Sequence, residues 1–286
     1  MRIIVCAKQI CYVYARTGMD PEQNFLAPED KIYRINPYDE VAVELALKVK
    51  ELHGAGEVII LTLGTIIAET ELRRCLAMGA DHLYWIDRGD KMDPWHKSSF
   101  LARAIKDIDA DLVLCGKESL DTQNGQVGAF MAHHLGVPFV SAITELAIGE
   151  DSPSAQVRRS AGRGLREVIE CPLPAVFSVD LGLHELRLPT YKNKKKALSM
   201  PIQKLSYREE IIAPKTISID IFTPRPRPKW VPPPDSRLAA YDRIEQLLTG
   251  SRIEKKGRVL RGDPESQAEG IISFLREHGF LEERLG

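Results

Sequence analysis

Residues 111–128 read DLVLCGKESLDTQNGQVG, which is a buried strand, a polar loop and the first turn of a helix in succession. Leu112–Cys115 is a continuous apolar run, a pattern typical of a strand that is covered on both faces. Small and polar residues follow it and lead into a helix predicted over Gly125–Leu135. This order presents free backbone N–H groups at a helix N-terminus, where proteins commonly bind phosphate.

The same unit of strand and helix occurs three more times on the N-terminal side of this stretch. Short apolar runs predict buried strands over Arg2–Ala7, Glu57–Leu63 and His82–Ile86. Amphipathic segments predict the helices between them, which begin at Asn36-Pro37 and run to Leu52, then cover Thr70–Met78 and Pro94–Ile108. Four β–α alternations favour an α/β fold with a doubly wound parallel sheet.

The pattern changes after residue 140. Strands are predicted around the turn Ala161–Gly164 and over Pro174–Asp180 and Thr216–Phe222. Residues 224–234 are so rich in proline that they predict an extended arm, and two amphipathic helices follow it over Arg237–Leu248 and Gln267–His278. We therefore expect a nucleotide-binding α/β domain over residues 1–223, then a proline-rich arm and C-terminal helices over residues 224–286.

Composition and charge exclude several classes of protein. The 286 residues include 39 basic and 40 acidic side chains, so a nucleic-acid binder, which usually has a basic excess, is not expected. Apolar runs are too short for a signal peptide or a membrane-spanning helix, and no membrane insertion is expected. The 5 cysteines are scattered and form no CxxC pair, which fits a cytoplasmic protein in a reducing compartment.

Polar turns are expected to meet at one edge of the sheet, because ligands of open α/β sheets bind beyond the carboxyl ends of the strands. Gly125 and Gly128 would let the backbone approach a phosphate closely. The alternative, a polar loop that only caps its helix, stays open. The turn Asn36–Glu40 likewise either caps its helix alone or also contacts a ligand. No catalytic nucleophile or general base and no metal site is predicted, since GxSxG, HExxH and Ser-His-Asp patterns are missing.

A basic run, Lys192–Lys196, lies within residues 184–204, which are rich in turn residues. Such runs are usually solvated surface loops. Docking to an acidic partner by electrostatic steering is the alternative.

Five motifs in the same order make the chain resemble the β subunit of electron-transfer flavoproteins. The matching segments are Val5–Gln9, Ile35–Glu44, Leu72–Asp81, Asp111–Gly128 and Leu173–Val176. The resemblance covers about residues 1–225 and is weaker from about residue 256 to the end. It implies an adenine nucleotide α-hydrolase-like fold, in a heterodimer with an α subunit that holds most of an FAD.

The resemblance also implies a nucleotide in the β subunit itself, either AMP or a second FAD. The positions that would bind it are Ala7, Asn36, Pro37, Tyr38, Asp39, Leu63, Ser119, Leu120, Asp121, Thr122, Gln123, Asn124, Gly125, Gln126, Val127 and Gly128. Members that bind AMP carry DDDxNQTG, whereas residues 121–128 here read DTQNGQVG. The QVG ending is similar to the electron-bifurcating and FixA-like branch, so AMP and FAD both remain open.

The function implied is electron transfer. Electrons would pass from flavin dehydrogenases, above all the acyl-CoA dehydrogenases of fatty acid oxidation, through FAD to a quinone oxidoreductase or another acceptor. The alternatives are a bifurcating complex whose β-subunit FAD oxidises NADH, and a nucleotide-binding sensor of similar fold. Residues 225–255 have no counterpart in short members and suggest extra contacts with the partner subunit.

The resemblance also implies a docking segment. The family pattern R-Y-x-[ST]-L corresponds to Arg187–Tyr191, so Tyr191 lies where the family has leucine. We expect Tyr191 to anchor the donor dehydrogenase and Lys194, Lys195 and Lys196 to steer it.

Overall fold

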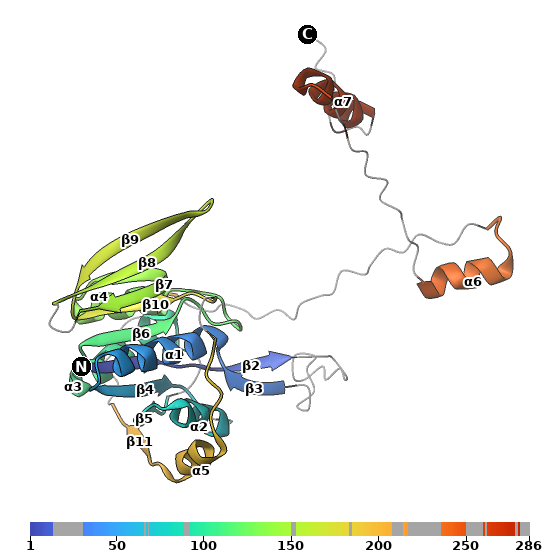
Figure 1. Cartoon of the computed structure of the whole chain (residues 1–286). Helices are drawn as coiled ribbons and strands as arrows, with labels where there is room; N and C mark the ends of the chain where they lie inside the picture. The colour runs from blue at the N-terminus through green and yellow to red at the C-terminus, as the bar shows by residue number, and fades with distance from the viewer. Residues whose placement is uncertain are drawn as a thin grey trace. The chain divides into compact units, whose positions relative to one another are not determined.

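The computed structural model (Figure 1) describes residues 1–13, 31–65, 67, 69–88, 92–149, 153–182, 185–207, 214–216, 236–249, 260, 262–277 and 280. The chain divides into two compact units, Met1–Thr223 and Pro224–Gly286.

The first unit is built on a nine-stranded sheet with the strand order β11-β5-β4-β1-β6-β10-β7-β8-β9. The strands are β1 (Arg2–Cys6), β4 (Glu57–Leu63), β5 (His82–Ile86), β6 (Leu112–Gly116), β7 (Phe139–Ile148), β8 (Ser154–Gly162), β9 (Leu165–Pro172), β10 (Ala175–Val179) and β11 (Ile202–Leu205). From β11 to β7 the neighbouring strands are parallel, whereas β8 pairs antiparallel with β7 and with β9. The four N-terminal strands predicted from the sequence lie side by side in its parallel part, in the order β5-β4-β1-β6.

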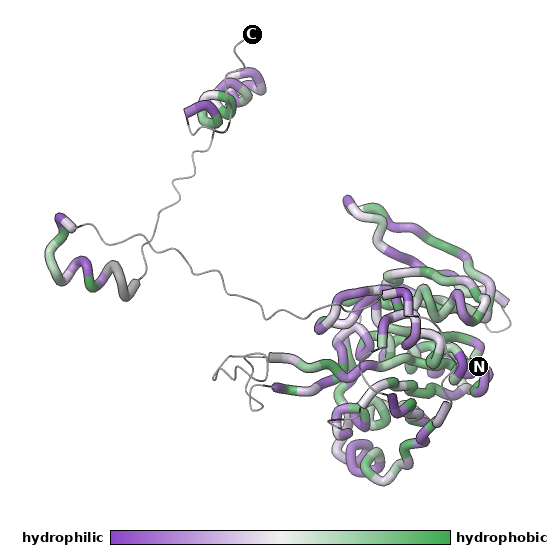
Figure 2. The backbone as a smooth tube through the Cα atoms, turned by 180° about the vertical axis from the view of Figure 1, so that it is seen from behind, coloured by the Kyte–Doolittle hydropathy of each residue, from purple (hydrophilic) through white to green (hydrophobic). Residues whose placement is uncertain are grey.

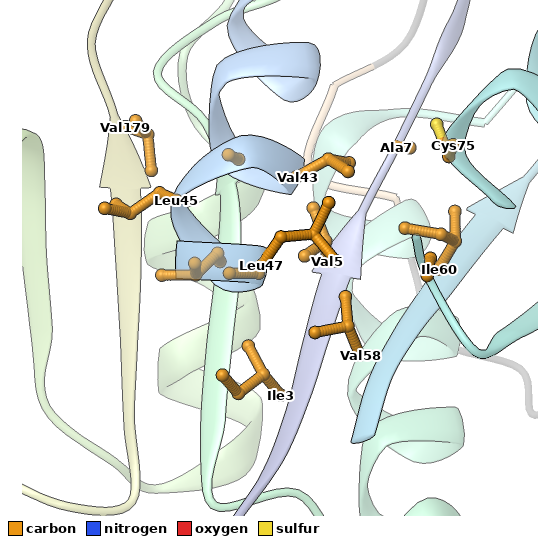
Figure 3. Close-up of a cluster of buried hydrophobic side chains, with 14 of the residues drawn as sticks. Ile3, Val5, Ala7, Val43, Leu45, Leu47, Val58, Ile60, Cys75 and Val179 are labelled. Atoms are coloured by element: carbon orange, nitrogen blue, oxygen red, sulfur yellow. The ribbon is translucent and has the colours of Figure 1, made fainter. Parts of the chain in front are cut away.

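Helices cover both faces of the sheet, so the doubly wound α/β prediction is confirmed (Figure 1). On one face lie α1 (Pro37–Leu52), α2 (Glu69–Met78) and α5 (Tyr191–Ser199). On the other face lie α3 (Pro94–Ile108) and α4 (Val127–Leu135). Figure 3 shows the α1 side chains Val43 and Leu47 against Val5 of the central strand. In Figure 2 green, hydrophobic stretches run through the body of this unit.

Two local predictions about this unit need correction, and one small element is additional to them. Helix α4 begins at Val127 rather than at Gly125, whose positive φ of 60° belongs to the preceding turn. The basic run lies on helix α5 instead of a loop, because the Thr190 side chain accepts the N–H of Asn193 and starts a helix there. A small antiparallel pair, β2 (Gln9–Val13) with β3 (Lys31–Ile35), was not predicted.

The predicted strand Thr216–Phe222 is wrong at Thr216, which is not in a strand, and the rest of it lies outside the described residues. Residues 224–234, the predicted arm, also lie outside them.

The second unit contains α6 (Ala240–Thr249) and α7 (Pro264–Glu277). Helix α7 begins earlier than predicted, because the Asp263 carboxylate accepts the backbone N–H groups of Glu265 and Ser266 at 3.1 and 3.0 Å. The side chains of Ile271 and Phe274 on α7 are exposed within the chain. Among the described residues, no helix has the length and apolar character needed to cross a membrane.

Candidate functional site

The carboxylate of Asp39, in the first turn of α1, joins the carboxyl ends of the two central strands. One oxygen accepts the backbone N–H of Lys8 after β1 at 2.8 Å, and the other accepts that of Gly116 at the end of β6 at 2.9 Å. The residue is only 5% exposed. The end of β1, the end of β6 and the start of α1 therefore meet at one point of the sheet edge, as expected for a ligand site.

Asn36 has a different role from the one predicted. Its side chain makes no capping hydrogen bond to α1, although Pro37 does occupy the first turn. Instead, its amide nitrogen donates to the Glu118 carbonyl at 2.8 Å and its amide oxygen accepts the Leu120 N–H at 3.2 Å. Asn36 thus fixes the loop that follows β6, and the predicted side-chain cap is wrong.

The loop after β6 folds on itself and is tied to β1. The ammonium of Lys8 lies 2.7 Å from a carboxylate oxygen of Asp121 and 3.2 Å from the Ser119 hydroxyl. The hydroxyls of Ser119 and Thr122 are 2.8 Å apart, and the Gln123 N–H donates to the Ser119 carbonyl at 2.8 Å. The predicted ligands Ser119–Asn124 therefore form a compact turn in front of α4.

Gly128 was predicted to let the backbone approach a phosphate, but its surroundings show that glycine is needed there for packing. A Cβ at Gly128 would lie 2.9 Å from the sulfur of Cys115 and 3.1 Å from the ring of Phe139. The glycine allows α4 to pack closely on the sheet, so the expectation that it opens the backbone toward a phosphate is not supported by its surroundings. Gly125 remains at the loop surface with a positive φ.

A second polar group lies at the same edge, beside β10. The Tyr38 hydroxyl donates to the Glu118 carboxylate at 3.3 Å, and the Lys117 ammonium lies 3.1 Å from Asp180, which follows β10. The pKa of Tyr38 is raised by burial and by the neighbouring Glu118 carboxylate, so the phenol stays protonated. Sequence reasoning did not identify Asp180, because the end of a buried strand carries no local signal for this pairing.

The other predicted ligands, Ala7 and Leu63, lie at the ends of the neighbouring strands. Ala7 is buried in the core, where Figure 3 shows it near Cys75, and its N–H donates to the Leu61 carbonyl of β4 at 2.9 Å. Leu63 ends β4 and is partly exposed. The predicted docking residues Tyr191 and Lys194–Lys196 are exposed on α5, which packs on α2 and not at this edge. Within the described ranges, no group of three potential metal-binding side chains occurs.

Burial raises the pKa of Asp39 to about 7, against the lowering effect of the N–H groups of Lys8 and Gly116 and of the Asn36 side chain. A carboxyl whose folded-state pKa is raised favours folding while it is protonated, and this contribution is lost as the pH rises through about 7. We therefore expect the free energy of unfolding to fall by a few kcal/mol through Asp39 alone as the pH rises from about 4, the usual pKa of aspartate, to about 7.

The measurement is urea unfolding across this pH range for the wild type and for Asp39→Asn, which cannot titrate. The difference between the two profiles should reveal the step. Glu69→Gln, which removes an exposed acid from the first turn of α2, is the matched control. Parallel profiles of wild type and Asp39→Asn would show that Asp39 does not titrate near neutrality.

Comparison with known proteins agrees with this architecture. Residues 25–210 match the family model described as the electron transfer flavoprotein domain. The chain is 32% identical over 279 residues to the electron transfer flavoprotein subunit beta of Bacillus subtilis, covering 93% of this chain and 96% of the relative. It is 33% identical over 223 residues to the caffeyl-CoA reductase-Etf complex subunit CarD of Acetobacterium woodii, covering 77% and 84%. The human electron transfer flavoprotein subunit beta is 28% identical over 225 residues, covering 77% and 84%. The extent of these matches, together with the doubly wound sheet, shows that the chain belongs to the electron transfer flavoprotein family, among its β subunits.

Proposed function

We propose that the chain is the β subunit of a heterodimeric electron carrier, which passes electrons from a flavin dehydrogenase through an FAD shared with an α subunit to a quinone oxidoreductase or another acceptor. The observation that carries this proposal is the sheet edge around Asp39. It offers the N-terminal backbone amides of α4 and fixed polar turns, which are suited to binding. Redox chemistry would be supplied by the flavin, which the protein would bind and orient.

The nucleotide of the β subunit itself would lie at this edge. The N-terminal amides of α4 and the turn Ser119–Asn124 are suited to a phosphate group, since unpaired N–H groups at a helix start favour anions. The turn from Asn36 to Asp39 would contact the ligand through its backbone, because both side chains are held inward by protein partners. AMP and the adenylate half of an FAD present the same chemistry to these groups.

An electron-bifurcating complex is the second candidate function. It is favoured by the segment Gln126–Gly128 and by the similarity to CarD. The two candidates differ in flavin content and in electron donor. A carrier should contain one flavin and be reduced by an acyl-CoA dehydrogenase with its substrate. A bifurcating complex should contain two flavins and be reduced by NADH. Visible spectra of the purified heterodimer before and after anaerobic addition of each donor therefore distinguish them.

Helix α5 is our proposed docking site for the dehydrogenase. Tyr191 is 83% exposed in its first turn, and Leu198, which lies two turns later on the same side, is 62% exposed. Of the nine residues of α5, only Ala197 is buried. Exposed apolar side chains among four lysines fit a partner with an apolar pocket and an acidic rim.

We expect Tyr191→Ala to slow flavin reduction by the dehydrogenase about 30-fold, because truncating an exposed aromatic anchor typically removes about 2 kcal/mol of binding. Stopped-flow reduction at several salt concentrations is the measurement, with bound flavin counted in parallel. Leu165→Ala, at an exposed position on β9, is the control. Equal rates and equal salt dependence in wild type and Tyr191→Ala would rule out this docking mode.

The second unit is proposed to contact the α subunit. The exposed Ile271 and Phe274 side chains of α7 would be covered in such a contact.

All five cysteines are free thiols, and we propose a cytoplasmic location on that ground.

A further inference from the structure

The buried carboxylate of Asp39 holds together three segments that would surround the nucleotide. Its two oxygens accept the backbone N–H groups that end β1 and β6, at 2.8 and 2.9 Å. Those two strands are neighbours in the sheet, and Ile3–Cys6 of β1 pair with Leu112–Cys115 of β6. Lys8 and Gly116 lie beyond the last residues that pair between these two strands, Cys6 and Cys115, and their N–H groups are donated to Asp39 instead.

The surroundings of Asp39 are shaped for this carboxylate. Gly116 leaves room for it, since a Cβ there would lie too close to a carboxylate oxygen of Asp39 and 2.6 Å from the Cβ of Tyr38. Glu40, the next residue on α1, instead faces Arg74 at 3.0 Å. A favourable interaction with the helix dipole is available to both acids, so the dipole does not explain why Asp39 alone is turned into the sheet.

We propose that Asp39 is the positioning residue of the nucleotide site, and that its ionised carboxylate sets the spacing of the β1 and β6 ends against which the nucleotide binds. This inference rests on the proposed nucleotide site. Asn36 adds to the same arrangement by fixing the backbone at Glu118 and Leu120. In this proposal the side chains of Asp39 and Asn36 hold the backbone of the site in place and do not contact the nucleotide themselves.

Ionisation matters because both neighbours of the carboxylate are N–H donors. An ionised carboxylate accepts both bonds and strengthens them, whereas a protonated one carries an O–H group that competes with a donor. Protonation should therefore weaken these two N–H bonds and loosen the ends of β1 and β6 locally, although it removes the larger cost of burying the charge and so raises the free energy of unfolding. The pKa of Asp39 near 7 places this change close to neutrality.

Four titratable groups lie close enough to Asp39 to interact with it electrostatically. They are Cys6 at the end of β1, Lys8 just after β1, Cys115 on β6 and Cys75 on α2. Burial raises the pKa of all three thiols, so they stay protonated near neutrality. The Lys8 ammonium, which also pairs with Asp121, favours the ionised form of Asp39. Asp39 is therefore the group in this cluster whose charge changes near neutrality.

The test uses adenosine as the probe, because it has no phosphate and no group that titrates near neutrality. Its affinity for the charcoal-treated heterodimer is measured by equilibrium dialysis at about pH 6 and about pH 8. We expect wild-type affinity to be about fivefold higher at the higher pH. Asp39→Asn should bind more weakly than wild type at the higher pH and lose the pH dependence. Glu69→Gln, at an exposed position in the first turn of α2, should keep both the affinity and the pH dependence.

Hydrogen–deuterium exchange of the same proteins adds a readout that does not require a ligand. Faster exchange of the peptides containing Lys8 and Gly116 is expected in Asp39→Asn and not in Glu69→Gln. A wild type that binds no adenosine would overturn the nucleotide site, and the positioning role with it. Wild-type binding with the same pH dependence in Asp39→Asn, or unchanged exchange, would overturn the positioning role alone.

Discussion

Replacing Gly116 by alanine is expected to lower the free energy of unfolding by about 3 kcal/mol and to weaken nucleotide binding. The added Cβ would lie too close to an Asp39 oxygen, 2.6 Å from the Tyr38 Cβ and 3.2 Å from the Asn36 amide nitrogen. These contacts cannot all be relieved by a side-chain rotation, since α1 would have to move away from β6. The measurement is chemical unfolding together with nucleotide retention after gel filtration.

Gly136→Ala is the matched control. Gly136 has open space around its Cβ position but a positive φ of 73°, so alanine there should cost only about 1 kcal/mol and leave nucleotide binding unchanged. Equal losses of stability in the two variants would mean that the close contact at Gly116 is relieved easily, and that the packing of α1 on β6 does not depend on glycine.

The second large effect is expected from Arg187→Met, which should destabilise the protein by about 3 kcal/mol. The Arg187 guanidinium makes hydrogen bonds of 2.8 and 3.0 Å to Glu44, whose residue is only 2% exposed, and of 2.6 Å to Glu51 at the end of α1. Both carboxylates raise the pKa of Arg187, so it stays charged. Removing the guanidinium would leave a buried carboxylate without its partner.

Chemical unfolding of three variants separates the buried pair from the exposed one. Glu51→Gln should change stability by less than about 1 kcal/mol, because the Glu51 side chain is 60% exposed. The double variant Arg187→Met with Glu44→Met should recover much of the loss, since replacing both members of a buried pair by apolar groups is often nearly neutral. A double variant as unstable as Arg187→Met would contradict this explanation.

The sequence predicted those elements whose signals are local. Helix α3 has the predicted bounds, Pro94–Ile108. Its start is marked locally, because the Asp93 side chain caps the helix by accepting the N–H of His96 and a proline occupies the first turn. The central strands were predictable because parallel strands covered on both faces read as continuous apolar runs. The edge of the sheet that holds the candidate site could be predicted for the same reason, because each predicted strand also gives the residue at which it ends.

Helix α5 and the inward direction of Asn36 could not be predicted, because both depend on distant residues. Helix α5 buries only Ala197, and a helix this short is marginal without tertiary support. The Arg73 guanidinium on α2 supplies that support by donating to the carbonyls of Ala197 and Met200 at 2.7 and 2.6 Å. Asn36 resembles a capping residue in sequence, yet its amide is used by a loop that lies 82 residues later in the chain.

The central claim is that this β subunit holds a nucleotide of its own at the sheet edge within an electron-carrying heterodimer. The direct measurement is to denature the purified heterodimer and to count the flavins and adenine nucleotides released, by chromatography and mass spectrometry. We predict one FAD together with one further adenine nucleotide, with the second nucleotide absent or strongly reduced in Gly116→Ala. A wild-type heterodimer that releases a single FAD and no other nucleotide would contradict the account.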